Sequence, residues 1–361
     1  LTPEALSAVR LPHLVVGAMP EAEREPRLPM LMHSPPGWII NTDPPRQLRL
    51  RRLMMKAFGR KVVEDIRPFA REIIAETLDS VAAGGEGECV SQVARLIPAK
   101  VILRLFGLSE DVLPKLHHWS LVLNGSLGGF AQTPESLVEC EAVMQEMRAY
   151  FAPEIARRVA NPTEDFLSLL ATAREEGDDK LSEDEMVGIC IVSLIAGHDT
   201  TANTMAMGVA ALSDHPEAAA AMRQATGEEL ETAVLEIMRY IGMSTMMPRI
   251  VAEDFTWHGH ELKKGQFVFL MIAGANRDPD VFPDPDKLDL TRSQFPNMTF
   301  APGLHHCIGH LLAKMQLNEF FPEFTRRFDA EVLDDHLHFG LSMSFRGLET
   351  LNLRLIPRAA A

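Results

Sequence analysis

The stretch FAPGLHHCIGH, residues 300–310, contains three histidines, two glycines and a cysteine. A helical pattern over 308–321 follows it, so Cys307 lies just before a predicted helix. The amide groups at a helix N-terminus stabilise a thiolate. The chemistry of this stretch therefore decides how the rest of the chain is interpreted.

Two interpretations of Cys307 need no cofactor or only a metal ion. A cysteine is often a small buried hydrophobe, and Gly309 beside it would then form a turn. Alternatively, zinc would use the nitrogen and sulfur ligands of His305, His306, Cys307 and His310. However, adjacent His305 and His306 point in different directions, and no second ligand pair stands at a recognisable spacing elsewhere. Both interpretations leave part of the stretch unexplained.

The third interpretation is a haem site. Gly303 and Gly309 let the backbone approach a flat ligand closely. A thiolate held near helix amides suits an axial ligand of haem iron and pushes electron density onto the metal. Haem also carries two propionates, which need cationic partners when they are buried. His305, two residues before Cys307, is one candidate.

The same stretch resembles the haem-binding loop of the cytochrome P450 family, whose pattern is F-G-x-G-x-(H or R)-x-C-x-G. The matching residues are Phe300, Gly303, His305, Cys307 and Gly309. Ala301 stands where the pattern usually has glycine, a departure that would stiffen the loop. The resemblance implies that Cys307 ligates the iron of haem b.

An apolar run over 186–212 is longer than the ~20 residues that span a bilayer. Its middle carries Asp199, and an acid at the centre of a lipid-exposed helix would cost roughly 2.5–3.5 kcal/mol. We therefore expect a helix buried in protein and no membrane span. Ser182 and Glu185 form a capping box at its start, and His215-Pro216 ends it.

Within this helix, residues 196–201 (AGHDTT) are similar to the family's distal-helix pattern (A or G)-G-x-(D or E)-T-(T or S). The resemblance implies that the helix opens locally at Ala196 and Gly197 and makes room for dioxygen. It further implies that Thr200 hydrogen-bonds the oxygen under reduction and that Asp199 brings protons inward. In the simplest alternative, these side chains only bond back to the preceding turn.

Two further matches concern charge. Glu236 and Arg239 share a helix face about seventy residues before Cys307, and they resemble the family's buried structural ExxR pair. The family usually adds a third partner from a later meander, and its expected position here is Lys287. Residues 43–58 (DPPRQLRLRRLMMKAF) resemble the family's DPP helix. The resemblance implies propionate contacts from Gln47, Arg51 and Arg249, in addition to His305.

Bulk composition narrows the class of protein. The chain has 361 residues, 46% apolar, and a formal charge of -15, which argues against a general nucleic-acid binder. Its four cysteines form no CxxC pair, and its first residues form no signal peptide. These features favour a reducing cytoplasm.

We expect a mainly helical protein with small sheets, a single domain over 1–361. Helices are predicted at 48–58, 137–159 with a kink or break near Pro153, 182–214, 228–240 and 308–321. A small sheet is predicted at 249–272, an irregular meander at 276–292, a hairpin near 338–345, and surface loops at 82–88 and 174–180. The P450 resemblance begins near residue 40, so we expect either that an N-terminal part of that fold is missing from this sequence or that the chain is an unusually short member.

The resemblance implies a haem-thiolate monooxygenase that inserts one atom of O2 into a small organic substrate. The alternatives are a peroxide-driven peroxygenase and a haem sensor without turnover. Because no GxGxxG motif is present, electrons would come from a ferredoxin-type or flavodoxin-type donor with its reductase. The predicted donor-docking residues are basic: Arg46, Arg49, Arg52, Lys56, Arg60 and Lys61.

The expected substrate pocket is apolar, which predicts an apolar or amphipathic substrate. It draws on the distal helix and on two later segments. The expected pocket residues are Met243, Thr245, Met246, Met247 and Met343.

Overall fold

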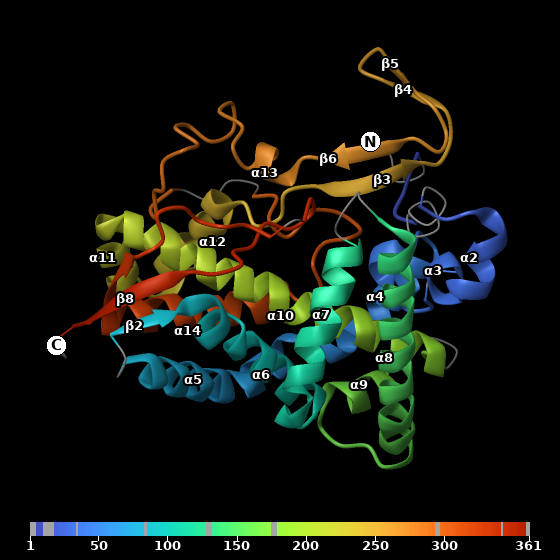
Figure 1. Cartoon of the computed structure of the whole chain (residues 1–361), viewed down its shortest axis with the longest axis horizontal. Coiled ribbons are helices and arrows are strands. Elements are labelled where there is room, and N and C mark those ends of the chain that lie inside the picture. Colours follow the sequence, from blue (N-terminus) through green and yellow to red (C-terminus); the bar gives the residue numbers. More distant parts are fainter. Residues whose placement is uncertain are drawn as a thin grey trace. The chain divides into compact units, whose positions relative to one another are not determined.

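The computed structural model describes residues 5–9, 18–33, 35–82, 85–127, 132–174, 179–292, 297–340 and 342–358. The chain forms two compact units, each assembled from separated stretches of sequence. Unit 1 consists of Leu1–Gly59, Pro114–Ile195 and Met246–Met271, and unit 2 consists of Arg60–Leu113, Ala196–Thr245 and Ile272–Ala361. Helices dominate the chain, and the sheets are small, as predicted (Figure 1).

Unit 1 is a group of helices with one three-stranded sheet. Its helices are α2 (Glu21–Arg27), α3 (Pro29–His33), η1 (Ile39–Asn41), α4 (Arg46–Ala57), α7 (Leu113–Leu127), α8 (Pro134–Ala160), α9 (Phe166–Thr172) and the first part of α10 (Glu183–Asp214). Its strands are β1 (Leu6–Ser7), β3 (Met247–Val251), β4 (Phe255–Trp257), β5 (His260–Leu262) and β6 (Phe267–Leu270).

The sheet of unit 1 has the order β1-β3-β6, and all of its pairs are antiparallel. Leu6 faces Val251 across one pair, and Met247 faces Leu270 across the other. Strands β4 and β5 form a hairpin whose turn residue Gly259 has a φ of 82° (Figure 1). The sheet and the turn predicted between 249 and 272 are confirmed.

Two polar contacts organise the helices of unit 1. The buried Glu141 carboxylate on α8 accepts the backbone N–H groups of Met30 and Leu31 at 3.1 Å, which satisfies the first turn of α3. Ser182 and Glu185 form the predicted capping box, with bonds of 3.0 and 3.1 Å. Of the kink or break predicted near Pro153, the break is wrong, because α8 runs continuously through it.

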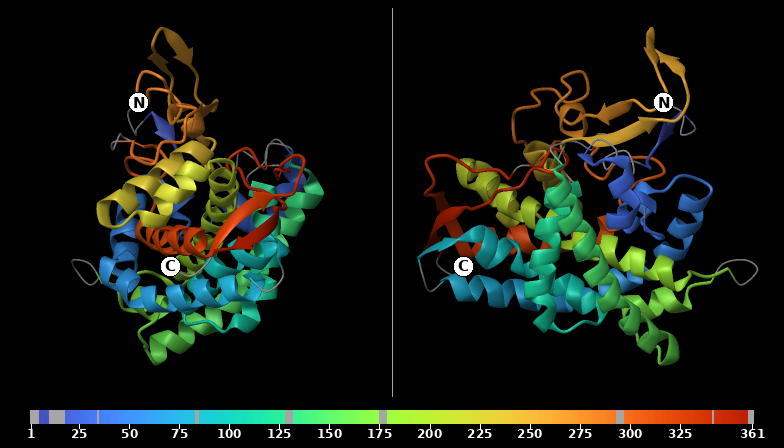
Figure 2. Two further views of the ribbon diagram at one scale, coloured as in Figure 1. Left: turned by 90° about the vertical axis from the view of Figure 1, so that its left-hand side faces the viewer. Right: turned by 45° about the vertical axis from the view of Figure 1, so that its right-hand side comes forward.

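Unit 2 contains the larger part of the hydrophobic core. Its helices are α5 (Arg60–Ala82), η2 (Val90–Ala94), α6 (Leu96–Phe106), η3 (Glu110–Val112), the second part of α10, α11 (Pro216–Gln224), α12 (Gly227–Ile241), α13 (Ile272–Ala275) and α14 (His310–Arg327). Its strands are β2 (Glu86–Glu88), β7 (Phe328–Val332) and β8 (Asn352–Pro357), in the order β2-β8-β7 (Figure 2).

Close packing between α10 and α14 explains one glycine of unit 2. A Cβ atom at Gly208 would lie 2.4 Å from the Phe321 ring, so only glycine allows this approach. Leu317, Phe320 and Phe321 of α14 are fully buried in the same core. The helix that follows the cysteine loop is therefore anchored along its length.

Several boundaries differ from the sequence predictions. Residues 86–88, predicted as part of a surface loop, form strand β2 because β8 supplies their backbone partners. Helix α14 starts at His310 and extends to Arg327, past Pro322. The region 276–292 is irregular, as predicted. Residues 175–178 of the loop predicted at 174–180, and residue 341 of the hairpin predicted near 338–345, lie outside the described residues. Phe339 and Leu348 form an antiparallel bridge in the predicted hairpin region.

The buried-helix prediction for 182–214 is confirmed, since α10 ends at Asp214 before His215-Pro216. Within the described part of the chain, no helix is both long and apolar enough to cross a bilayer.

Candidate functional site

The four cysteines differ in their surroundings. Burial raises the pKa of the Cys89 and Cys140 thiols to about 12, and it also raises the pKa of Cys190 well above its usual range. Cys307 is only half-buried and lies two residues before Gly309, the N-cap of α14. Among these thiols, Cys307 therefore has the position best suited to a thiolate.

The loop before Cys307 is closed by backbone hydrogen bonds. The Cys307 N–H donates to the Phe300 carbonyl at 2.9 Å, and the His306 N–H donates to the Gly303 carbonyl at 3.0 Å. Phe300 packs against the core of unit 2. The predicted ligand is thus attached to a partly buried residue at the far end of its own loop.

Two residues of the loop have left-handed backbone conformations. Gly303 has a φ of 92°, which glycine adopts readily, but Ala301 has a φ of 50°. A side chain in this region costs about 1–2 kcal/mol. The departure from the P450 pattern at Ala301 therefore strains the loop, whereas the sequence indicated only stiffening.

The glycines of this loop fit a ligand outside the chain. No described atom lies within 4 Å of a Cβ built at Gly303 or Gly309, and Gly309 has an ordinary φ of -81°. Packing within the protein therefore gives no reason for glycine at position 309. A flat group that approaches the backbone, such as haem, gives one. His305 lies half-buried in the same loop.

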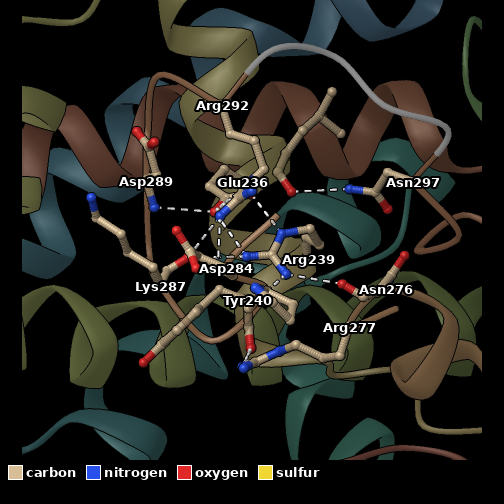
Figure 3. A network of polar contacts seen from close by, with 12 residues as sticks. Glu236, Arg239, Tyr240, Asn276, Arg277, Asp284, Lys287, Asp289, Arg292 and Asn297 are labelled. Carbon is tan, nitrogen blue, oxygen red and sulfur yellow. Dashed lines mark hydrogen bonds and ion pairs between the residues drawn. The ribbon is translucent and has the colours of Figure 1, made fainter. Parts of the chain in front are cut away.

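A network of buried charges supports the loop (Figure 3). The Arg239 guanidinium donates to the Glu236 carboxylate at 2.7 and 2.9 Å, and both side chains are almost fully buried. Arg292 donates its Nε–H to the same carboxylate at 3.1 Å. The prediction of Lys287 as the third charged partner is wrong: only its backbone carbonyl takes part, accepting from Arg239 and Arg292 at 3.2 Å.

Asn276 links this network to the cysteine loop. Its backbone carbonyl accepts from Arg239 at 2.9 Å (Figure 3). Its side-chain oxygen accepts the Met298 N–H at 2.8 Å. Met298 is two residues before Phe300, where the loop begins. The sequence analysis did not identify Asn276 or Arg292. Arg292 could have been found, because it is an arginine within the predicted meander.

The polar segment of α10 is a regular helix. The Thr200 hydroxyl donates to the Ala196 carbonyl at 2.9 Å, and the Thr204 hydroxyl donates to the Thr200 carbonyl at 2.8 Å. The His198 Nε2 lies 3.1 Å from the Asp199 Oδ1, and the imidazole is buried. The predicted local opening is not found, because these side chains bond back to an uninterrupted helix.

Packing accounts for Gly197, which the resemblance assigned to the cofactor site. A Cβ atom there would lie 2.9 Å from the Cδ1 of Ile102 on α6. The glycine therefore allows α6 to approach α10 closely. Ala196 contributes the backbone carbonyl that Thr200 contacts.

Three predicted pocket residues belong to unit 2, and backbone contacts link their two segments. The Thr245 hydroxyl donates to the Met343 carbonyl, and the Met243 carbonyl accepts the Arg346 N–H at 2.6 Å. Met343 has an exposed fraction of 42% despite this contact, whereas Met243 is buried. Met246 and Met247 belong to unit 1, where Met247 starts β3.

The predicted propionate ligands of unit 1 lie on α4 and β3. Gln47 is fully buried on α4, and Arg51 is half-buried one turn later. Arg249 on β3 donates to the Pro248 carbonyl at 2.9 Å, and no described carboxylate lies within ion-pair distance of it. Burial lowers the pKa of Arg249, while Asp43 acts against that shift. A half-buried cation of this kind fits an anionic group such as a propionate.

Much of the predicted basic docking surface is paired within the protein. Arg49 contacts Asp179 and Glu185 at 2.8 and 2.9 Å, Lys61 contacts Asp65 at 2.5 Å, and Lys56 donates to the Arg174 carbonyl. Arg46 lies 3.8 Å from the Glu185 carboxylate. Arg60 and Lys61 also belong to unit 2, whereas the other four residues belong to unit 1. The surface thus has less uncompensated positive charge than the sequence indicates.

Comparison with known proteins identifies the family of this chain. A family model described as "Cytochrome P450" matches residues 134–339. The biotin biosynthesis cytochrome P450 of Bacillus subtilis is 31% identical over 322 residues, which cover 89% of this chain and 80% of that protein. The 6-deoxyerythronolide B hydroxylase of Saccharopolyspora erythraea is 32% identical over 317 residues, which cover 87% of this chain and 77% of that protein.

A solved structure supports the fold. P450BioI, in complex with acyl carrier protein ligated to hexadec-9Z-enoic acid, has a TM-score of 0.87 and 29% identity, and the match covers 98% of this chain and 87% of that one. Relatives of this family bind haem b, use O2 and receive electrons from separate redox proteins. The chain belongs to the cytochrome P450 family and is a haem-dependent monooxygenase.

Proposed function

We propose that Cys307 would hold the iron of haem b through its thiolate and that Asp199 and Thr200 would supply protons for the reduction of oxygen. The observation that carries this assignment is the half-buried position of Cys307 before the α14 N-cap. The other three thiols are buried elsewhere in the chain. His305, Gln47, Arg51 and Arg249 would bind the propionates, and Phe300, Gly303 and Gly309 would form the loop around the ligand.

When bound, haem supplies the iron on which dioxygen is reduced. The chain supplies the protons that this reduction consumes. The Thr200 hydroxyl already donates to the Ala196 carbonyl at 2.9 Å, so it is oriented by its own helix. Rotation about the Cα–Cβ bond of Thr200 would free this proton without breaking a backbone hydrogen bond. The Asp199 carboxyl group, half-buried next to His198, would replace it after taking up a proton from solvent.

The substrate we propose is an apolar or amphipathic organic molecule. The Thr245 hydroxyl contacts the Met343 backbone, and the Met243 carbonyl accepts the Arg346 N–H, so backbone contacts link the two segments that would offer two thioethers and a hydroxyl. Methionine adapts its shape to irregular apolar ligands. Relatives named for such substrates include the mycinamicin IV hydroxylase/epoxidase of Micromonospora griseorubida and the vitamin D(3) 25-hydroxylase of Pseudonocardia autotrophica. Met246 and Met247 of unit 1 are further candidates for contact with the substrate.

We also propose that residues 1–361 act as one haem domain in the cytoplasm. The family match over residues 134–339 draws on both units, which supports a single domain. All four cysteines are free thiols, which supports a reducing compartment.

The test is turnover by purified haem-loaded protein on a panel of fatty acyl, macrolide and steroid compounds. Binding is first detected as a shift of the haem absorption band, and turnover is then compared with a ferredoxin system, with hydrogen peroxide and with neither. We expect product with the ferredoxin system, and we expect Thr245→Val to change which compounds bind. Product formed only with peroxide would contradict the role given to Asp199 and Thr200.

A further inference from the structure

Two histidines contact the backbone at both ends of the cysteine loop. The His310 Nδ1 lies 2.9 Å from the Cys307 carbonyl oxygen, and the His306 Nδ1 lies 3.3 Å from the Phe300 carbonyl oxygen. A carbonyl oxygen only accepts hydrogen bonds, so each imidazole must present an Nδ1–H to it. These carbonyls belong to Cys307 and Phe300. The same two residues are joined by the backbone hydrogen bond from the Cys307 N–H to the Phe300 carbonyl.

The rings of these residues also pack together. The His306 and His310 rings have centroids 4.6 Å apart at an interplanar angle of 31°. The Phe300 ring lies 6.0 Å from His310 and 6.4 Å from His306. The three rings therefore form one cluster, and two of them contact the carbonyls of the residues that close the loop. They form what we call the ring clasp, defined as Phe300, His306 and His310.

The loop that the clasp holds is strained. Ala301 has a φ of 50° one residue after Phe300, and its N–H donates to the Met298 carbonyl at 2.9 Å. An alanine in this conformation favours opening of the loop, because an extended backbone would relieve the strain. The side-chain bonds from His306 and His310 act against that opening.

We propose that His306 and His310 are positioning residues that hold the Cys307 loop in its ligating conformation against the strain at Ala301. This inference rests on the proposed role of Cys307 as the haem ligand. Neither histidine needs to touch haem: His310 acts through the Cys307 carbonyl, and His306 acts through the Phe300 carbonyl.

The contacts favour this role over a metal site built from the same side chains. Both Nδ1 atoms already face carbonyl oxygens. Among the described residues, no group of three histidine, cysteine or acidic side chains has the geometry to hold a metal ion. A simple packing role for the rings remains the alternative that an experiment must separate from hydrogen bonding.

His310→Asn and His310→Phe make this separation. Asparagine places an amide nitrogen near the former Nδ1 and keeps the donor, whereas phenylalanine keeps the ring and loses the donor. Both variants are purified with haem, and two quantities are measured. The first is the rate of haem transfer to excess apomyoglobin; the second is the fraction of the ferrous carbon-monoxide complex with a thiolate-type Soret maximum.

We expect His310→Phe to transfer haem about tenfold faster, as loss of one buried hydrogen bond would allow, and to lose part of the thiolate-type band. His310→Asn should stay within about twofold of the unmodified protein, because its donor is retained. Adding Ala301→Gly to His310→Phe should slow the transfer again, since it removes the opposing strain. The pair His306→Asn and His306→Phe should follow the same order with a smaller difference, because that contact is longer.

Equal rates for His310→Phe and the unmodified protein would overturn the inference, and so would equal impairment of His310→Phe and His310→Asn. If the unmodified protein itself shows no thiolate-type band, the assignment of Cys307 fails instead. The two failures are therefore distinguishable.

Discussion

The loop at residues 300–307 and the polar segment of α10 at residues 196–204 both belong to unit 2, but they are held in different ways. In the loop, Cys307 is fixed through its backbone by bonds to Phe300 and His310. In α10 the backbone is a regular helix, and the polar groups contact one another through side chains, as His198 does with Asp199.

This difference matches two chemical requirements. A metal ligand must keep its position, which backbone hydrogen bonds and packed rings ensure. A proton carrier must change its position, and side-chain bonds on a regular helix allow this at low cost because no backbone bond breaks. The two regions thus separate ligation from proton transfer within one unit.

The largest expected effect concerns the Glu236–Arg239 network, which supports the cysteine loop. Arg239→Ala would leave the buried Glu236 carboxylate with less compensation, and we expect a loss of about 3–5 kcal/mol in the free energy of unfolding. Urea unfolding of the haem-loaded protein measures it. Arg326→Ala is the control, since this exposed residue of α14 pairs weakly with Glu323, and it should cost less than about 0.5 kcal/mol. Equal losses for both variants would show that the buried network contributes no more stability than an exposed ion pair.

The proton-transfer role of the polar segment of α10 is tested by Thr200→Val and Asp199→Asn. Each removes a proton donor, and we expect product formation to fall about 10²-fold. Release of hydrogen peroxide per electron consumed should rise, because dioxygen is still reduced without productive protonation. Thr200→Ser keeps the hydroxyl and should retain most of the activity. Unchanged coupling of electrons to product in Thr200→Val would contradict the role of this segment.

A third test asks whether a fixed charge outside the loop also retains haem. Arg249→Met removes a half-buried cation, so the apoprotein should become more stable by about 1–2 kcal/mol while haem affinity falls by a similar free energy. Chemical unfolding of the apoprotein and haem transfer from the loaded protein measure the two quantities. Changes of the same sign in both would argue against a propionate contact.

The smallest effect concerns His198, whose imidazole orients the Asp199 carboxylate at 3.1 Å. His198→Phe should slow product formation about fivefold, the order expected for the loss of one polar contact. The solvent deuterium isotope effect on turnover should increase, since proton delivery becomes more rate-limiting. His198→Asn keeps a donor and serves as the control. An unchanged isotope effect in His198→Phe would leave His198 with a packing role only.

Local patterns predicted much of the fold. The Ser182–Glu185 capping box, the end of α10 at His215-Pro216 and the helix at 228–240 follow from residues that contact their own neighbours. The cysteine loop was also readable, because its pattern lies within eleven consecutive residues. These features need no knowledge of distant partners.

Features that depend on distant residues were missed or misassigned. Arg292 replaces Lys287 as the charged partner of Glu236 because the path of the meander decides which side chain reaches the carboxylate. Strand β2 forms only because β8, some 260 residues later, supplies its hydrogen bonds. The left-handed Ala301 and the ring clasp likewise depend on how the loop closes, which no local pattern specifies.

The most direct test of the account is the spectrum of the purified, ferrous, carbon-monoxide-treated protein, recorded for the unmodified chain, for Cys307→Ala, and for a variant with Cys89, Cys140 and Cys190 replaced by alanine. We predict a thiolate-type Soret maximum for the unmodified chain and the triple variant, and its loss in Cys307→Ala. A thiolate-type maximum that survives in Cys307→Ala would contradict the assignment of the haem ligand.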